Sequence, residues 1–323
     1  MCSKRILKIG TRDSKLALWQ ANTVKSLLEQ LGITTELVAV KSEGDLDLVT
    51  PLYAMGVQGV FTKTLDAYLL SHKIDVVVHS FKDVPTQLAQ GISQGAVLPR
   101  ASAGDLLVFK DPAFAAAFLA GEDKSLTGKV ATGSVRRTAQ ILEKFPQIQI
   151  ENLRGNVQTR MQKLHDNDWD AAIFAAAGLE RIAERPEQAR EIPWMLPAPA
   201  QGAIVVVART DDPEALSLIA PLNDPDTATA AGIERDFLST LMGGCSTPIS
   251  AYATVENGQI RFQGSILSLD GKQKYTTSRQ AALSEHTRLG AHAAKDLLQQ
   301  GADNIVQQIR ADIPDKMKQP AKD

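Results

Sequence analysis

The chain has 323 residues and little of several things, and each shortage excludes a class of protein. It has two cysteines, Cys2 and Cys245, which excludes a disulfide-rich secreted scaffold. Lys and Arg number 35 against 37 Asp and Glu, so there is no basic excess for a nucleic-acid partner. No apolar run approaches the roughly 20 residues that cross a bilayer, and the N-terminus has no apolar stretch of signal-peptide length. We therefore expect a cytoplasmic globular protein without a membrane partner.

Short apolar runs alternate with helical patterns over the first two-thirds of the chain. Strands are predicted at 5–9, 36–40, 75–79, 106–109, 129–132, 148–153, 171–176 and 204–208. Helical patterns lie at 16–31, 61–70, 135–145 and 156–165, and Gly32 is placed to end the first of these helices. Alternation of this kind predicts parallel or mixed sheets with helices on both faces.

The last third of the chain changes character. Residues 225–241 form a helical pattern, and residues 251–280 read as β-hairpins because ENGQ and LDGK are turn signals between alternating runs. Residues 286–309 are helical again, with a break near Gly301, and the tail from Asp312 is predicted to fray. This part is predicted to be a small α+β domain.

Three strand-to-helix junctions look alike, and ligand sites in open α/β sheets lie at such places. They read IGTRDS, ATGSVRR and ENLRGN, and each sets arginine beside small or hydroxyl residues. Helix starts attract anions, and a guanidinium group matches a carboxylate with two hydrogen bonds. The repetition favours a ligand with several acidic groups, although each of Arg12, Arg136, Arg137, Arg154 and Arg160 alone is also compatible with a solvated surface. There is no phosphate-loop or dinucleotide-binding motif.

Two further residues carry chemistry. Asp83 lies in HSFKDVP, directly after a buried strand, and is a candidate acid, base or cation stabiliser. Cys245 follows Gly243 and Gly244, which indicates a loop that presents the thiol for covalent attachment; the alternative is a buried, inert cysteine. We interpret His79 as a packed or capping residue. No set of His, Cys, Asp and Glu has metal-ligand spacing, so no metal is predicted.

Along nearly its whole length the chain resembles the porphobilinogen deaminase family, also called hydroxymethylbilane synthase. The motifs stand in the family's order: IGTRDSKLALWQ, VVHSFKDVP, ATGSVRR, LRGNVQTR, AAAGLERI, PAPAQGA and GGCSTPI. The resemblance implies two α/β domains like the halves of a periplasmic binding protein, with the active cleft between them, and a smaller α+β C-terminal domain. The expected bounds are 1–98 with 201–218, then 99–200, then 219–323.

The resemblance also implies an activity. The family joins four porphobilinogen molecules head to tail with release of ammonia, on a dipyrromethane cofactor held by a cysteine thioether, here Cys245, and then releases the linear tetrapyrrole by hydrolysis. Each pyrrole bears an acetate and a propionate, which accounts for the arginines, and a monomer is expected. The alternative is a non-catalytic, two-lobed binder of acidic small molecules. The lack of an export signal, and the pair of Asp83 and Cys245, weigh against it.

Site residues carry over position by position. The resemblance makes Asp83 catalytic. It assigns the cofactor to Cys245, Ser80, Lys82, Asp83, Thr132, Ser134, Arg136, Arg137, Arg154 and Gly155. It assigns the substrate and the growing chain to Arg12, Ser14, Arg154, Arg160, Arg181 and Gln201, the last in the crossover that closes the cleft. The chain departs from the family's usual pattern at Lys15, Val57, Gln58 and Gly133, which leaves the role of the 42–60 loop during elongation open.

Overall fold

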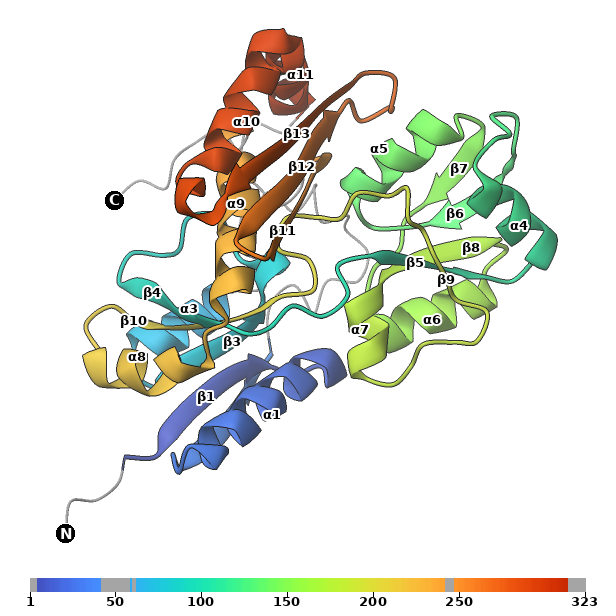
Figure 1. The fold of residues 1–323 in the computed structure, drawn as a ribbon. Helices are drawn as coiled ribbons and strands as arrows, with labels where there is room; N and C mark the ends of the chain where they lie inside the picture. The colour runs from blue at the N-terminus through green and yellow to red at the C-terminus, as the bar shows by residue number, and fades with distance from the viewer. Residues whose placement is uncertain (1–4, 42–58, 60–61, 242–246, 313–323) are drawn as a thin grey trace.

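The structure is a computed structural model that describes residues 5–41, 59, 62–241 and 247–312 (Figure 1). The first lobe is built on a sheet in the order β2-β1-β3-β10-β4. Its strands are β1 (Leu7–Arg12), β2 (Thr35–Val40), β3 (Val76–Ser80), β4 (Ile92–Val97) and β10 (Ile204–Arg209). Its helices are α1 (Lys15–Gln30), α3 (Lys63–Leu70) and α8 (Pro213–Ile219). The side chain of Ser14 begins α1 by accepting a hydrogen bond from the backbone N–H of Ala17.

The second lobe repeats the topology of the first. Its sheet has the order β7-β6-β8-β5-β9. The strands are β5 (Asp105–Phe109), β6 (Gly128–Ala131), β7 (Ile148–Glu151), β8 (Ala171–Ala175) and β9 (Arg190–Glu191). The helices are α4 (Pro112–Ala120), α5 (Val135–Lys144), α6 (Val157–Asp166) and α7 (Ala176–Arg181). In each lobe three neighbouring strands run parallel, and one antiparallel strand, β10 or β5, follows a crossover from the other lobe. The two crossovers therefore fix how the lobes face each other.

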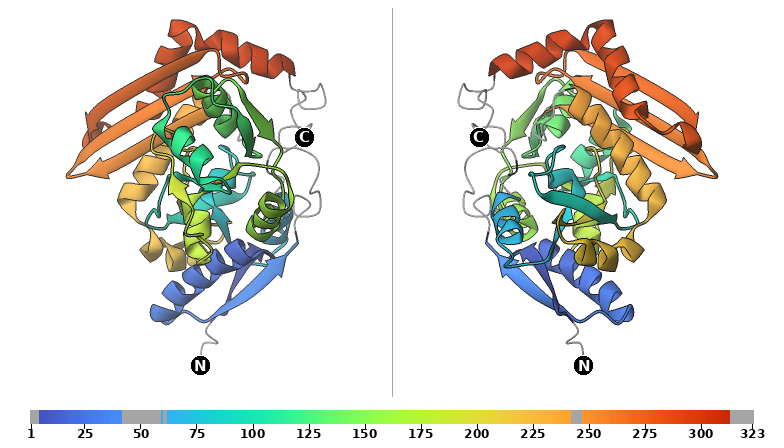
Figure 2. Two further views of the ribbon diagram at one scale, coloured as in Figure 1. Left: turned by 90° about the vertical axis from the view of Figure 1, so that its right-hand side faces the viewer. Right: turned by 90° about the vertical axis from the view of Figure 1, so that its left-hand side faces the viewer.

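The C-terminal unit packs helices on one face of an antiparallel sheet, at the top of Figure 1. The strands are β11 (Ile249–Glu256), β12 (Gln259–Leu267) and β13 (Lys274–Ala282), and the helices are α9 (Pro225–Leu241), α10 (Leu289–Leu297) and α11 (Asp303–Asp312). The predicted ENGQ turn joins β11 to β12, with positive φ at Asn257 and Gly258. The predicted helix break is at Gly301, whose φ is 108°. Figure 2 shows this unit lying against both lobes.

The predicted fold class is confirmed: two α/β units with mixed sheets and a smaller α+β unit. The first helix stops before Gly32, whose φ of 78° is the left-handed conformation that the prediction required. The strands β4 and β9 and the helices α4, α7 and α8 were not predicted from the sequence. No helix among the described residues is long and apolar enough to cross a membrane. Of the tail that is predicted to fray from Asp312 onward, Asp312 is the last residue of α11, and residues 313–323 lie outside the described part.

Candidate active site

Several of the predicted site residues lie at or directly after the ends of parallel strands. In the first lobe β1 ends at Arg12, and β3 ends at Ser80, followed by a short 3₁₀ turn, Phe81–Asp83. In the second lobe Thr132 and Ser134 follow β6, and Arg154 and Gly155 follow β7. Parallel strands present their carboxyl ends at one edge of a sheet, so each lobe contributes one such edge to the site.

The surroundings of Lys82 show that the sheet edges of the two lobes lie close together. Lys82 is half-buried, and its pKa is lowered to about 8: burial is the main cause, Arg136 and Arg137 of the second lobe add to it, and Asp83 and Asp105 partly offset it. Its Nζ also lies 3.4 Å from Oε1 of Gln201, a residue of the return crossover. A side chain of the first lobe thus lies within electrostatic reach of the arginines that begin α5.

Arg160 shows the same meeting from the other side. The pKa of its guanidinium is lowered to about 10, chiefly by burial and also by the charges of Arg137, Arg154 and Arg12, while Asp83 partly offsets the shift. Arg160 also donates from Nε to the backbone oxygen of Gly155 at 2.7 Å. The site therefore gathers cations from both lobes around Asp83, and their mutual repulsion favours an anionic ligand.

Sequence analysis missed Asp105, the first residue of β5. Its carboxylate is 1% exposed and pairs with Arg136 at 2.7 Å and with Arg137 at 2.7 Å. Burial alone raises the pKa of a carboxyl group, but the two arginines outweigh burial and hold the pKa of Asp105 well below its ordinary value. The arginines at the start of α5 had led us to expect negative charge from a ligand. Part of that negative charge comes instead from the carboxylate of Asp105 within the protein. The signal was an acidic residue opening the apolar run DLLVF.

Gln201 and Arg181 join the crossovers to the lobes. Gln201 is 1% exposed and its Nε2 donates to Oδ1 of Asp105 at 3.0 Å and to the backbone oxygen of Ala103 at 2.7 Å. Arg181 donates from Nη2 to the backbone oxygen of Gly202 at 2.7 Å and lies over the ring of Trp19 at 5.8 Å. Both residues therefore link the return crossover to the second lobe.

Three hydroxyl groups of the site, those of Ser14, Ser80 and Thr132, have partners within the protein. Besides Ser14, Ser80 accepts a hydrogen bond from Nε2 of Gln20 at 2.8 Å, and Oγ1 of Thr132 accepts one from the N–H of Ser134 at 3.3 Å. These bonds orient the hydroxyl groups and leave each of them a further lone pair or proton for a ligand.

His79 is a packed histidine. It is 6% exposed, and burial together with the nearby charge of Arg12 lowers its pKa to about 3, so it is neutral at physiological pH. No group of three His, Cys, Asp or Glu side chains among the described residues is placed to hold a metal ion. Cys245, Val57 and Gln58 lie outside the described residues.

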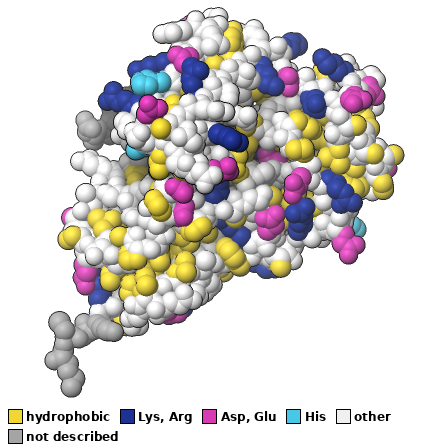
Figure 3. All heavy atoms as spheres, viewed as in Figure 1, with side chains coloured by type: hydrophobic (Ala, Val, Ile, Leu, Met, Phe, Trp, Pro, Cys, Tyr) yellow, Lys and Arg dark blue, Asp and Glu magenta, His cyan; other side chains and the backbone are white. Residues whose placement is uncertain are grey.

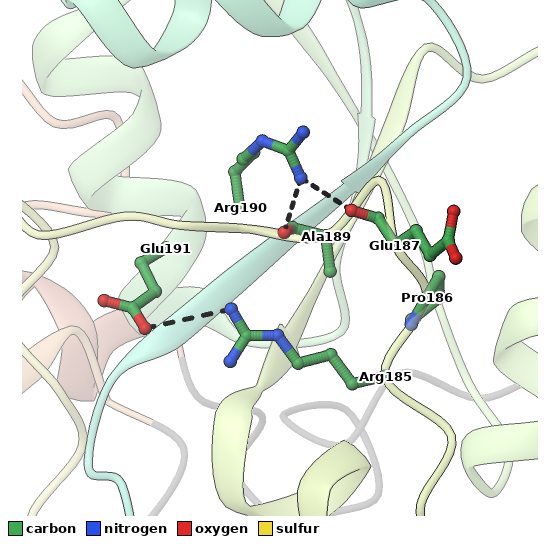
Figure 4. A pocket seen from close by; sticks show the side chains of 6 residues that line it. All are labelled: Arg185, Pro186, Glu187, Ala189, Arg190 and Glu191. Carbon is green, nitrogen blue, oxygen red and sulfur yellow. Dashed lines mark hydrogen bonds and ion pairs between the residues drawn. The ribbon is translucent and has the colours of Figure 1, made fainter.

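Two hollows lie away from these residues. A shallow one of about 530 Å³ lies at residues 185–191, where Arg185 and Glu191 pair at 3.8 Å (Figure 4). A groove of about 1120 Å³ runs between the crossovers and the C-terminal sheet, lined in part by Arg100, Gln140 and Tyr252. Figure 3 shows acidic and basic side chains interspersed on one face of the molecule, whereas Arg136, Arg137 and Arg154 are each at most 5% exposed. These three arginines therefore concentrate positive charge in the interior of the second lobe.

Comparison with known proteins agrees with this geometry. Residues 7–217 match the family model described as porphobilinogen deaminase, dipyromethane cofactor binding domain, and residues 228–299 match that of the porphobilinogen deaminase C-terminal domain. The chain belongs to the porphobilinogen deaminase family. The porphobilinogen deaminase of Syntrophobacter fumaroxidans is 39% identical over 309 residues, 94% of this chain and 98% of that protein. That of Syntrophotalea carbinolica is 39% identical over 308 residues, 94% of this chain and 96% of that protein.

Solved structures of other proteins also align. An ancestral cationic amino acid solute-binding protein aligns with a TM-score of 0.42 at 17% identity, over 67% of this chain and 87% of that chain. A periplasmic domain of Bordetella pertussis BvgS aligns with a TM-score of 0.41 at 14% identity, over 67% and 86% of the two chains.

The residues fit the cofactor that the family model names, as the sequence predicted. Arg12, Lys82 and Arg160 bring positive charge from both lobes to one place, and the carboxylates beside them, Asp83 and Asp105, do not balance it. The buried Nε of Arg136 has no hydrogen-bond partner among the described residues. A dipyrromethane whose rings carry acetate and propionate groups supplies the carboxylates that such a site attracts.

Proposed function

We propose that this chain acts as a hydroxymethylbilane synthase: it condenses porphobilinogen head to tail between its two lobes, releases ammonia at each step and then releases the linear tetrapyrrole by hydrolysis. The observation that carries this proposal is the meeting of cations from both lobes around Asp83. The predicted partner is the small molecule porphobilinogen, and we propose that the chain works in the cytoplasm as a monomer.

The cations bind and orient the substrate. Arg12, Arg160 and Arg181, with Arg154, Ser14 and Gln201, are proposed to hold the acetate and propionate groups of the incoming ring and of the growing chain. Binding several carboxylates in fixed forks removes rotational freedom from the ring before reaction. Lys82 adds a charge next to Asp83, and binding of an acidic ligand there favours its protonated form.

Asp83 is proposed to be the catalytic residue. Loss of the amine from porphobilinogen leaves positive charge on the pyrrole ring. A carboxylate held in a partly dehydrated site stabilises that charge and accepts a hydrogen bond from the pyrrole N–H. Asp83 is half-buried, so it is both reachable and partly shielded from water. A carboxyl group at this position also serves as the proton donor or acceptor for the departing amine.

We propose that the dipyrromethane is attached to Cys245 through a thioether. When bound, it supplies the pyrrole carbon from which the chain grows. The residues proposed to hold it are Ser80, Lys82, Asp83, Thr132, Ser134, Arg136, Arg137, Arg154 and Gly155. The φ of Gly155 is +112°, a conformation that side chains rarely adopt, so this loop needs glycine to bring its backbone to the cofactor.

Intact mass and ammonia release test the proposal together. Protein made in a porphyrin-producing host is expected to be heavier than its sequence by one dipyrrole, mapped to Cys245, and to release ammonia from porphobilinogen. An apo mass combined with no ammonia release would favour the non-catalytic binder of acidic small molecules.

The variant Asp83→Asn tests the catalytic residue. It is expected to fold and to keep KM within about threefold while its rate of ammonia release falls by about 10²-fold or more, because Asn keeps the shape but not the charge. Asp168→Asn is the matched control, since the side chain of Asp168 is 99% exposed. Full activity of Asp83→Asn would remove Asp83 from its role.

A further inference from the structure

Arg235, on helix α9 of the C-terminal unit, forms hydrogen bonds with the backbone next to the turn that carries Asp83. Its Nη1 donates to the backbone oxygen of Val84 at 2.9 Å, and its Nη2 donates to that of Pro85 at 2.5 Å. The guanidinium carbon lies 4.4 Å from the centre of the Phe81 ring, within the range of a cation–π contact. Nη1 also lies 3.5 Å from the backbone oxygen of Phe81. One side chain thus contacts both ends of the turn.

Backbone hydrogen bonds and burial also hold the turn in place. The N–H of Phe81 donates to the backbone oxygen of Ala203 at 3.0 Å, and the N–H of Val84 closes the turn on the oxygen of Phe81 at 3.2 Å. Phe81 and Val84 are each 2% exposed, whereas Lys82 and Asp83 between them remain half-buried. The backbone is therefore anchored on both sides of the two side chains that face the site, and Arg235 supplies the anchor that comes from outside the first lobe.

We propose that Arg235 is a positioning residue for Asp83. It acts through the backbone of the turn, and the inference rests on the catalytic role proposed for Asp83. The helix that carries Arg235 ends at Leu241, shortly before Cys245, so the C-terminal unit that bears this cysteine also holds the catalytic turn. The same unit contacts the second lobe, because Gln140 of α5 donates to Oγ of Ser250 at 3.1 Å. Through these contacts the C-terminal unit sets the distance between the turn and the arginines of α5.

The test compares Arg235→Gln and Arg235→Lys with the wild-type chain. Arg235→Gln loses the cation and the fork, so its kcat for ammonia release is expected to fall by about 10- to 100-fold, since small misplacements of a catalytic group have effects of this size. KM is expected to stay within about threefold of the wild-type value. The mass of the bound dipyrrole is expected to be unchanged. Arg235→Lys keeps one charged donor and is expected to recover part of kcat. A merely structural role would lower the amount of folded protein without this split between kcat and KM.

Lys274→Gln is the control for contacts of the C-terminal unit. Lys274 pairs with Glu143 of the second lobe at 3.3 Å on the surface, and its loss is expected to leave kcat unchanged. Wild-type kcat in Arg235→Gln would overturn the positioning role and leave the proposed function intact; if that variant does not fold, wild-type kcat in Arg235→Met, which keeps the length of the side chain but has no donor, would overturn it. Absence of ammonia release from the wild-type chain would overturn both.

Discussion

Gln201 and Asp105 meet at 3.0 Å, from Nε2 to Oδ1, and this contact ties the return crossover to the carboxylate beneath the arginines of α5. The amide oxygen of the same side chain, Oε1, lies 3.4 Å from Nζ of Lys82 in the first lobe. A single amide therefore touches both lobes at the site. The placement of Lys82 relative to Asp105 therefore depends on how the two lobes face each other.

Replacing Asp105 is expected to destabilise the protein. Asp105→Asn leaves Arg136 and Arg137 buried without their counter-charge, and breaking a buried pair in this way costs about 3–5 kcal/mol of unfolding free energy. Denaturant unfolding measures this loss. Asp168→Asn removes an exposed pair with Lys129 and is expected to change stability by less than about 1 kcal/mol. Equal stability of the two variants would contradict the argument.

The difference between wild type and Asp105→Asn depends on pH in a defined direction. Because the folded protein holds the pKa of Asp105 below its ordinary value of about 4, its carboxylate contributes stability above that pH. This contribution is lost as the pH falls below 4, toward the depressed pKa. Unfolding measured from pH 7 to pH 3 is expected to show the gap between the two proteins begin to narrow near pH 4, and not at higher pH.

Lys82 predicts a fall in activity on the alkaline side. Its pKa is lowered to about 8, chiefly by burial, so its attraction for carboxylates fades as the pH rises through that value. Bound acidic groups raise this pKa, so the fall in kcat/KM is expected at or above pH 8. Lys82→Arg keeps its charge to higher pH and is expected to lose this fall between pH 8 and 10. Identical profiles for the two proteins would rule out Lys82 as the cause.

Much of the fold was predictable because the pattern of apolar residues is local. Strand β8 is a continuous apolar run and β3 begins with one, and the turn at Asn257 and Gly258 has residues that suit positive φ. The helix α4, PAFAAAFLA, was missed because its residues are nearly all apolar, so its sequence has no polar face to reveal a helical period. Strand β4, ISQGAV, was missed because its polar residues and Gly95 weaken the alternation.

The motifs were enough to predict the main site residues. The residues that contact them inside the protein could be found only from the fold. The arginines stood out because their type and positions suit an acidic ligand, and Asp83 stood out as a carboxyl group directly after a buried strand. Asp105, Gln20 and Arg235 act on residues 31 to 154 positions away in the sequence, and no local pattern indicates such a contact. The positions that only the structure reveals are thus those that orient the predicted residues.

Glu234 is expected to be a critical residue for the crossovers. Its fully buried carboxylate binds Arg100 through two bonds of 2.7 and 2.8 Å, and it accepts hydrogen bonds from the N–H groups of Ala200 and Ala253. Glu234→Gln removes the charge opposite Arg100 and is expected to cost about 3 kcal/mol, seen in calorimetry as a melting temperature lower by about 5 °C. Glu214→Gln, at an exposed pair with Arg5, is the control and is expected to melt close to wild type.

A comparison of alanine substitutions at Gly271 and Gly258 separates the cost of backbone strain from the cost of a steric clash. Both have a φ of 72°, so a change to Ala at either costs about 1 kcal/mol from the left-handed conformation. At Gly258 a Cβ would meet nothing within 4 Å, whereas at Gly271 it would lie 2.5 Å from the backbone N of Glu143 and 2.7 Å from the backbone O of Ala139 on α5. Gly271→Ala is therefore expected to be about 1–3 kcal/mol less stable than Gly258→Ala in denaturant unfolding, because the hairpin must move off the second lobe. Equal losses for the two variants would show that the turn does not dock on α5 in solution.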